Sequence, residues 1–600
     1  MLASLYQQSS SPAPPLRIGL LLDTTAMERC FAEAIEHIQQ SAFARIELVV
    51  FHADEQGKAA AQQIRRPLPA RALAILRDER KRGALLYALY ERWDSRRIHA
   101  ADNPFATVDC SALIAGIDRL SVVPIGKKFV HRFPEESLRI IRDKRLDVLV
   151  RFGFGILRGE ILTAARCGIW SYHHGDNDYY RGGPAYFWEV YEGNPISGAI
   201  LQILSEQLDA GKVLYKGYFA TLLGISVAQN RLAPGWGATT FLIQKLRELH
   251  ERGLEQVEHN ALPLSPYLGK KKLYSLPTNL EMLRWLGPAL LSKLAKRLTT
   301  RTSVLHWRLA VRKGGKKLFD SGSAPDISDF RWMEAPRGRF YADPFLIEAD
   351  GRMWVFFEDF DYHTERGIIS CAEMLDDGTL GVRPALAMPF HLSYPCIFRA
   401  EGQYYMIPES AANRTISLYR AVRFPDQWQL EKELFRASAV DTTVLAEGGL
   451  YWFFVTLEEP RGFATQMWLF SANSLTGEWT SHPANPIFTD ARRNRGAGAI
   501  FRHNRKLIRP SQDCTVTYGR SFTFNEILQL DREHYREAPM ITVSPQSVRN
   551  LKGTHTYAQA GDIEMIDGCT LVPRSRVIGG GNQPAIPENA IISTPGGAVR

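Results

Sequence analysis

The first 260 residues alternate short apolar runs with segments in which apolar and polar residues mix. Apolar runs of strand length, rich in Leu, Ile and Val, predict buried strands at 16–22, 46–51, 146–151, 168–172 and 197–204. Apolar residues at helical spacing predict helices at 26–40, 134–144 and 237–253. A strand–helix–strand beginning implies a parallel sheet with right-handed crossovers, so we expect a Rossmann-like α/β domain over 16–260.

A different pattern begins near residue 318. Short strands alternate there with turns, as in AEGQYYMIP and AEGGLYWFFVTL, and they recur about every 45 to 55 residues, a spacing typical of propeller blades. The repeats predict an all-β, five-bladed propeller over 318–585. Residues 1–15 and 586–600 do not continue either pattern, and we expect them to be tails.

The segment 261–317 lies between the two patterns and is rich in Leu, Lys and Arg. We predict a basic, helical connector that packs on one of the domains. Residues 283–317 also fit a peripheral contact with an anionic membrane, because they combine leucines with cations. That alternative stays open at this point.

The composition narrows the class of protein without changing this division. The net charge of +9 over 600 residues is mild and does not indicate a nucleic-acid partner. The seven cysteines are scattered and form no C-x-x-C pair, which favours a reducing, cytoplasmic setting and argues against a zinc site. No run approaches the ~18 apolar residues of a membrane helix. The oligomeric state cannot be inferred from these numbers.

Candidate chemistry gathers where predicted strands end in loops. Ser171 and His173 are two residues apart on one strand, so their side chains share a face. The strand then enters a loop, which places both residues at the carboxyl edge of the sheet, where α/β proteins bind ligands. Asp209, which follows the next strand, can return to the same edge. A histidine near a carboxylate is a candidate proton-transfer pair.

This stretch resembles the catalytic core of the formyltetrahydrofolate-dependent formyltransferases. Arg181-Gly182-Gly183-Pro184 follows His173 as in that family, and Asp209-Ala210-Gly211 matches its aspartate turn. The segment 147–157 resembles the strand and loop that line the folate pocket. The resemblance covers roughly 16–250. The family asparagine falls on Ser171 here, and a serine hydroxyl can donate one hydrogen bond.

The resemblance implies roles for particular residues. His173 would stabilise the oxyanion or carry a proton, Asp209 would set the state of His173, and Ser171 would donate to the oxyanion. The donor co-substrate would be formyl-tetrahydrofolate, without a metal. The residues expected to bind it are Phe152, Gly153, Phe154, Gly155 and Ile156. The residues expected to face the substrate in this domain are Tyr180, Arg181, Gly182 and Gly183.

Repeated motifs also mark the propeller, at 341–345, 393–395, 441–443, 495–498 and 553–557. With HLSYP and GEWTSHPANP, they resemble the propeller of the plant glucosamine inositolphosphorylceramide transferases and their bacterial relatives. Candidate carboxylates for an axial pocket are Asp343, Glu409, Asp441 and Asp513. A pair of them could act as acid and base on a glycosidic bond, or they could cap turns and bind sugar.

These features together predict transfer of a formyl group to the amine of a sugar or glycan precursor, with the propeller binding the carbohydrate. The alternatives are a carbohydrate-processing or glycosyl-transfer protein with its active site in the propeller, and a non-catalytic glycan-binding module. A hydrolase triad has little support, because no G-x-S-x-G surrounds Ser171.

Overall fold

The computed structural model describes residues 6–55, 82–126, 130–206, 211–263, 265–322, 325–375, 381–458, 463 and 465–577. The chain divides into two compact units, Met1–Lys293 and Leu294–Arg600. Within the described residues, no helix is both long enough and apolar enough to cross a membrane.

The first unit is built on a seven-stranded sheet in the order β11-β10-β9-β7-β1-β3-β5. Its strands are β1 (Leu16–Leu22), β3 (Ala44–His52), β5 (Asp118–Val122), β7 (Val148–Arg151), β9 (Ile169–His173), β10 (Ile196–Ile203) and β11 (Lys212–Ala220). The first five are parallel, whereas β10 runs antiparallel to both β9 and β11. The α/β prediction is therefore confirmed, and the sheet is mixed because β10 follows β9 without a crossover.

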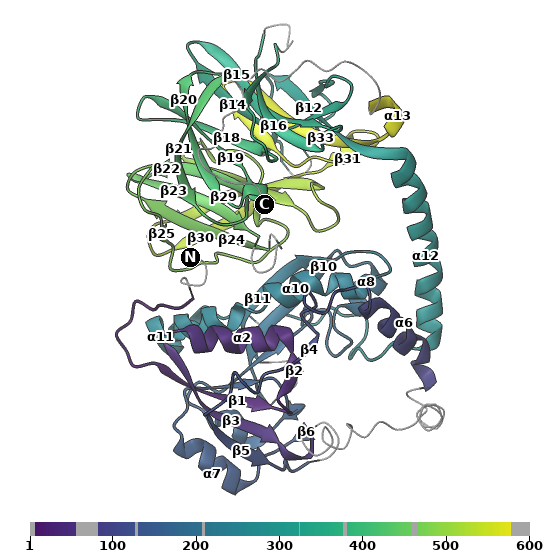
Figure 1. Ribbon diagram of the computed structural model, residues 1–600, viewed down its shortest axis with the longest axis vertical. Coiled ribbons are helices and arrows are strands. Elements are labelled where there is room, and N and C mark those ends of the chain that lie inside the picture. Colours follow the sequence, from purple (N-terminus) through teal and green to yellow (C-terminus); the bar gives the residue numbers. More distant parts are fainter. Residues whose placement is uncertain are drawn as a thin grey trace. The chain divides into compact units, whose positions relative to one another are not determined.

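Helices cover both faces of this sheet. In Figure 1, α2 (Arg29–Gln40) and α11 (Phe241–His259) lie over one face and α7 (Glu135–Asp143) over the other. Other helical segments are α6 (Leu85–Ser95), η1 (Gly159–Thr163), α8 (Phe187–Glu192), α9 (Val227–Asn230) and α10 (Leu232–Gly237). Leu138 and Ile141 of α7 pack with Leu48 and Val50 of β3 in one buried cluster, as expected where alternate residues of a strand face opposite layers.

Three boundaries in this unit differ from the predictions. The helix expected from residue 26 begins at Arg29, because β2 (Ala26–Glu28) pairs with β4 (Thr107–Asp109). The late helix starts at Phe241 and contains a non-helical Gly253 with φ 80° and ψ 172°. The expected N-terminal tail is partly packed, since Tyr6 is buried and the Ser9 hydroxyl lies 2.7 Å from His250 Nδ1. The short strands β6 (Val130–His131) and β8 (Ile156–Leu157) pair in parallel.

The predicted connector at 261–317 is shorter than expected. It contains one long helix, α12 (Asn279–Thr302), and then enters β12 (Ser303–Lys313) directly. Strand β12 belongs to the propeller, because all its residues pair antiparallel with β33 (Ile563–Pro573), from Ser303↔Pro573 to Lys313↔Ile563. Sequence pattern alone could not show this pairing, since the two strands are about 250 residues apart.

In the described part of the second unit, the strands form five sheets, which are the blades of a propeller. Blade 1 contains β14 (Arg339–Ala349), β15 (Arg352–Asp361), β16 (Arg366–Glu373) and β17 (Arg383–Leu386). Blade 2 contains β18 (Ser393–Ala400), β19 (Gln403–Glu409), β20 (Ile416–Arg423) and β21 (Gln427–Phe435). Blade 3 contains β22 (Ala439–Glu447), β23 (Leu450–Leu457), β24 (Gln466–Ala472) and β25 (Thr480–Ser481).

The last two blades are less regular. Blade 4 contains β26 (Arg495–Gly496), β27 (Phe501–His503), β28 (Lys506–Asp513), β29 (Ser521–Leu530) and β30 (Tyr535–Val543). Blade 5 joins β31 (Leu551–Gly553), β32 (Tyr557–Ala560) and β33 to β12 and β13 (Arg331–Trp332). The ring is thus closed by pairing an early strand with a late one, and Figure 1 shows β12 in teal beside β33 in yellow. Short helical turns are η2 (Leu318–Asp320), η3 (Ala411–Asn413), η4 (Pro545–Ser547) and α13 (Arg574–Val577).

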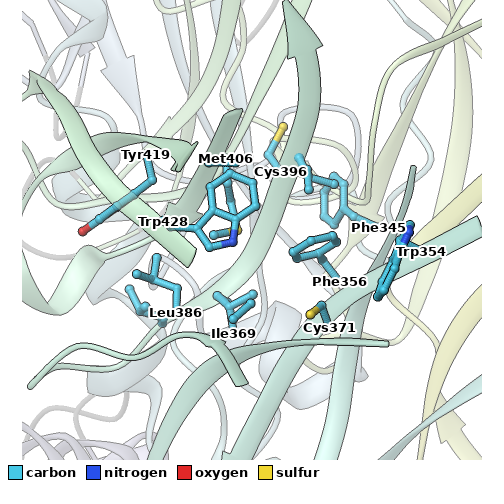
Figure 2. Close-up of a cluster of buried hydrophobic side chains, with 14 of the residues drawn as sticks. Phe345, Trp354, Phe356, Ile369, Cys371, Leu386, Cys396, Met406, Tyr419 and Trp428 are labelled. Atoms are coloured by element: carbon cyan, nitrogen blue, oxygen red, sulfur yellow. The ribbon is translucent and has the colours of Figure 1, made fainter. Parts of the chain in front are cut away.

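Neighbouring blades are held together by buried side chains between their sheets. Figure 2 shows such a cluster, in which Phe345, Phe356 and Ile369 of blade 1 face Met406 and Trp428 of blade 2. The rings of Phe356 and Trp428 meet edge to face with their centroids 5.8 Å apart. Burying this aromatic surface stabilises the contact between blades 1 and 2. The contact also determines the positions of the inner strands of these blades.

Candidate functional site

The inner strands of the blades are interrupted at equivalent places around the propeller axis. Strand β14 lies beside both β18 and β32, and β18 lies beside β22, so the first strands of the blades surround the axis. The pairing of β14, β18 and β22 shifts register in each case, and the bulged residues are Asp343, Tyr394 and Asp441. Their φ angles are 53°, 42° and 52°. Three non-glycine residues in the left-handed region indicate strain that the fold maintains at one place.

The fourth and fifth blades repeat the interruption by splitting the inner strand. In blade 4, β26 and β27 are separated around Gly498, which has φ 128°. A side chain at Gly498 would meet the carbonyl oxygen of Tyr557 at 2.0 Å, so glycine is required by close approach. In blade 5, β31 and β32 are separated by residues 554–556, which include His555.

Asp343 and His555 form one half of the resulting axial cluster. The Asp343 carboxylate accepts hydrogen bonds from the Thr556 hydroxyl (2.8 Å) and the Tyr394 amide (3.2 Å). His555 places Nδ1 2.6 Å from Asp567 Oδ2 and Nε2 3.4 Å from Asp343 Oδ1. Burial lowers the pKa of His555, but the carboxylates of Asp567 and Asp343 outweigh it and raise that pKa above its ordinary value.

Asp441, Arg495 and Glu409 form the other half. Arg495 Nε lies 2.5 Å from Asp441 Oδ2, and Gln512 Nε2 donates to the same oxygen at 3.3 Å. The amide of Asp441 donates to Glu409 Oε2 at 3.3 Å. Burial, and then the charge of Asp441, raise the pKa of Glu409 to about 8, although Arg495 opposes the shift.

Glu358 on β15 joins the cluster and was not predicted from the sequence. Its carboxylate is nearly buried, and Oε1 lies 3.6 Å from His391 Nε2. Burial, then the charges of Asp343 and Glu409, raise its pKa well above the ordinary value. The sequence does contain a signal for this residue, because Glu358 directly follows the apolar run Val355–Phe357 and comes shortly before Phe360. A charged residue in such a strand is seldom buried unless it has a partner or a function.

Aromatic side chains lie at the edge of these charges. Tyr518 is 54% exposed, and the Arg495 guanidinium lies 4.9 Å from the centre of its ring. The His555 ring lies 5.4 Å from that of Tyr518 and 4.1 Å from that of Trp307. An exposed aromatic face beside buried carboxylates combines stacking area with polar groups, which is the usual make-up of a small-molecule site.

The arrangement brings together three of the four carboxylates expected at the axis, and Asp513 is the exception. Its carboxylate accepts hydrogen bonds from the amide (3.0 Å) and hydroxyl (2.7 Å) of Thr515, within the turn after β28. The neighbouring Gln512 reaches Asp441 instead, because successive residues of a strand point to opposite faces. The prediction for Asp513 as a pocket residue is therefore corrected to a turn cap.

The first unit has a separate cavity of about 590 Å³ at the carboxyl edge of β9. Gly155, Ile156, His173, Gly182 and Gly183 line it, as expected from the sequence. The two residues predicted to act at this edge already make hydrogen bonds within the protein. His173 Nε2 donates to the carbonyl of Tyr180 at 2.8 Å. The Ser171 hydroxyl donates to the carbonyl of Tyr172 at 3.2 Å and accepts from Arg151 at 2.9 Å.

Other residues predicted for this cavity have structural roles. Phe154 is fully buried in the core, and the ring of Phe152 packs 4.9 Å from that of Phe31. Gly153 is buried against Asp23. The hydroxyl of Tyr180 bonds Asn194 and Glu192, and the side chain of Arg181 donates to the carbonyl of Asn177. Asp209, the predicted partner of His173, lies outside the described residues.

Two groups in the described part of the chain place possible metal ligands together. They are Asp343, His555 and Asp567 at the axis, and Glu28, Cys30 and His174 in the first unit. Asp176 and Asp178, which follow His174 closely in the sequence, instead form ion pairs with Lys216 at 2.5 and 2.6 Å.

The fold and its axial cluster define a five-bladed propeller with a polar centre, and comparison with known proteins matches this unit. Residues 332–565 match the family described as glucosamine inositolphosphorylceramide transferase 1, N-terminal. Glucosamine inositolphosphorylceramide transferase 1 of Oryza sativa subsp. japonica is 36% identical over 209 residues, which cover 34% of this chain and 28% of that protein. The protein of the same name from Arabidopsis thaliana is 36% identical over 208 residues, covering 33% and 27%. The match thus spans little more than a quarter of these relatives.

Solved structures resemble each unit only distantly. An exo-β-1,3-galactanase from Phanerochaete chrysosporium has 11% identity and a TM-score of 0.27, and covers 34% of this chain and 52% of its own. Glycinamide ribonucleotide transformylase 1 from Symbiobacterium toebii has 13% identity and a TM-score of 0.25, and covers 45% and 99%. Neither likeness carries an argument at these values.

The predicted formyl transfer is contradicted by these comparisons. The matching relatives are named for a different transfer, which involves glucosamine and inositolphosphorylceramide. At the predicted oxyanion site, the one proton of the Ser171 hydroxyl is donated to a main-chain carbonyl, and His173 Nε2 also donates to a main-chain carbonyl.

Proposed function

We propose that this chain is a carbohydrate-processing transferase whose propeller binds an amino sugar at the axial cluster and carries the reacting groups. The observation that supports this proposal is the convergence of Asp343, Glu358, Glu409 and Asp441 from three different blades, beside an exposed tyrosine. The names of the relatives, with glucosamine and an inositol-containing lipid, agree with such a substrate class.

The charge of the cluster favours a cationic sugar. Carboxyl groups outnumber the cations Arg495 and His555, and the pKa values of Glu358 and Glu409 are raised. An ammonium group bound beside them would favour their charged forms. Tyr518 offers an exposed ring against which a sugar face can pack. A neutral sugar would gain the ring contact but not the charge contact, so the cluster should prefer an amino sugar.

The same groups can supply acid and base. Glu409, with its pKa raised to about 8, holds a proton at neutral pH and can donate it to a leaving oxygen. Asp441, which forms an ion pair with Arg495, is the second carboxyl group and can accept the proton of the incoming hydroxyl. Two carboxyl groups with different states are the arrangement that glycosyl transfer to water or to another hydroxyl uses.

The test measures binding of D-glucosamine against D-glucose by calorimetry, and turnover of nitrophenyl glucosaminides. We expect tighter binding of D-glucosamine, and a loss of turnover of about 100-fold or more in Glu409→Gln. Asp513→Asn is the matched control, because this carboxylate lies in the same propeller but caps a turn, and asparagine can still accept from Thr515.

The outcomes separate the alternatives. Turnover that is unchanged in Glu409→Gln and in Asp343→Asn would remove the axial site from consideration. Binding of D-glucosamine without turnover in the unaltered protein would leave a non-catalytic glycan-binding module. Equal binding of both sugars would contradict the role of the carboxylates in recognition.

A further inference from the structure

Six leucines of α12 lie exposed on one stripe of the helix. They are Leu280 (55% exposed), Leu283 (62%), Leu290 (53%), Leu291 (70%), Leu294 (57%) and Leu298 (58%). At 3.6 residues per turn their positions fall within an arc of roughly 100°. Surface leucines are common singly, but six within one arc of a 24-residue helix, interrupted around Gly287 and Pro288, form an apolar surface that needs a partner. We call these six residues the leucine stripe.

The opposite face of α12 has a partner already. Met282 is fully buried, and Trp285 and Leu286 pack into the aromatic cluster of the first unit. The Trp285 ring lies 5.3 Å from that of Tyr90 and 5.4 Å from that of Phe187. This packing sets the rotation of the helix about its axis, so the leucine stripe is directed away from the cluster.

Basic residues, which we call the basic flank, lie beside the stripe and at its C-terminal end, with Lys296 on the opposite side of the helix. No acidic residue lies among them. After Glu281 the chain has no Asp or Glu until Asp320. The exposed basic residues of the helix over this span are Arg284, Lys293, Lys296, Arg297 and Arg301. An apolar stripe with a basic flank is the make-up of helices that lie in the interface of an anionic bilayer.

We propose that the leucine stripe docks on an anionic lipid bilayer, with the leucines entering the acyl boundary and the basic flank at the headgroups. A second copy of the helix is a poor occupant, because facing stripes would bring the two sets of cations together. The proposal concerns where the chain is held and does not depend on the reaction at the propeller axis.

The experiment is flotation of the full chain with vesicles of phosphatidylcholine alone and of phosphatidylcholine mixed with phosphatidylglycerol. We expect the chain to bind the mixed vesicles, and to bind them less as salt is added. The variant Leu290→Ser/Leu294→Ser/Leu298→Ser should lose affinity by about tenfold for each leucine. The variant Lys293→Glu/Lys296→Glu/Arg297→Glu should lose at least about tenfold on mixed vesicles.

Matched controls change the same residue types elsewhere. Leu89→Ser removes a leucine that is 58% exposed on α6, and Lys552→Glu reverses an exposed lysine of β31. Both should bind as the unaltered chain does. Circular dichroism shows whether each variant is folded, and the charge variant tests the proposal if the serine variant is not.

Three results would overturn the proposal. These are equal binding to both kinds of vesicle, binding that survives in both triple variants, and a serine variant that changes the mass of the particle in solution but not its flotation. The last result would make the stripe an interface between copies of the chain or with another protein.

Discussion

The cavity of the first unit and the cluster at the propeller axis differ in the hydrogen-bond partners of their polar side chains. In the first unit, His173 and Ser171 donate to main-chain carbonyls of the strand and loop that carry them. At the propeller axis, side chains of one blade bond those of another, as Asp343 does with Thr556 and Arg495 does with Asp441. In the first unit both donors thus bond the main chain, and Ser171 accepts from Arg151 on the neighbouring strand. The bonds at the axis form only when the ring of blades is closed.

The convergence of several blades at the axis explains why carboxyl groups there have raised pKa values. Burial, and then the charges of the carboxylates around them, raise the pKa values of Glu358 and Glu409. Such groups are retained where a ligand or a reaction needs them. The cavity beside His173 lies at the sheet edge where the sequence places His173, whereas the carboxyl groups with raised pKa values lie at the propeller axis.

The largest effect on stability should follow from removing the cation of the axis. Arg495→Met leaves the Asp441 carboxylate, 4% exposed, without its ion pair. We expect the free energy of unfolding to fall by about 3–5 kcal/mol, measured by denaturant unfolding with hydrogen exchange of propeller peptides. The double variant Arg495→Met/Asp441→Asn should recover part of the lost stability, because it leaves no unpaired carboxylate. If Arg495→Met were as stable as the unaltered chain, the buried ion pair between Arg495 and Asp441 would be contradicted.

A pH effect should follow from Glu409. Its pKa is raised from 4.5 to about 8, so between these values the folded state keeps a proton that the unfolded state has lost. Stability from this group is therefore full below about pH 4.5 and is lost as pH rises through about 8. In Glu409→Gln the free energy of unfolding should fall less between pH 4.5 and pH 8, by about a few kcal/mol. If the free energy of unfolding changed with pH as in the unaltered chain, the raised pKa of Glu409 would be contradicted.

The two units should respond to pH in opposite directions. Burial lowers the pKa of His174 in the first unit from 6.5 to about 3. The unfolded state therefore binds more protons between these values, and stability from this group is lost as pH falls through that range. His174→Gln should reduce the acid sensitivity of first-unit peptides in hydrogen exchange, while Glu409→Gln acts on the propeller at higher pH.

A smaller loss is expected for Tyr394→Phe. The buried hydroxyl bonds the Thr443 hydroxyl (2.8 Å), the Gly498 amide (2.8 Å) and the Gly498 carbonyl (3.2 Å). Its removal leaves the Gly498 amide without this acceptor, at a cost of about 1–3 kcal/mol. Thermal unfolding measures the change, with Tyr404→Phe, a partly buried tyrosine away from the axis, as the control.

The smallest effect is expected in the first unit. Ser171→Ala removes the hydrogen bond to the Tyr172 carbonyl and the one accepted from Arg151, which together cost about 1–2 kcal/mol. Because this hydroxyl lies in the first unit and not at the propeller axis, binding of D-glucosamine should not change. If Ser171→Ala lost binding of D-glucosamine, the assignment of sugar binding to the propeller axis alone would be wrong.

Much of the fold follows from local pattern. The apolar runs at 16–22, 46–51 and 146–151 become β1, β3 and β7, and the recurring strand–turn units become blades. The residue type at each bulge was also visible, since Asp343 and Asp441 stand in related motifs. Helix boundaries were less accurate, because β2 pairs with β4 across about 80 residues and competes with the start of α2.

The sequence by itself therefore determined the two kinds of architecture and the approximate place of the axial carboxylates. Only the tertiary structure decided that β12 closes the ring, that Gln512 and not Asp513 reaches the axis, and that Glu358 joins the cluster. The reason is distance along the chain. The amide of Asp343 donates to a carboxylate 224 residues away, and no periodicity of apolar and polar positions encodes which distant strand will stand beside a given one.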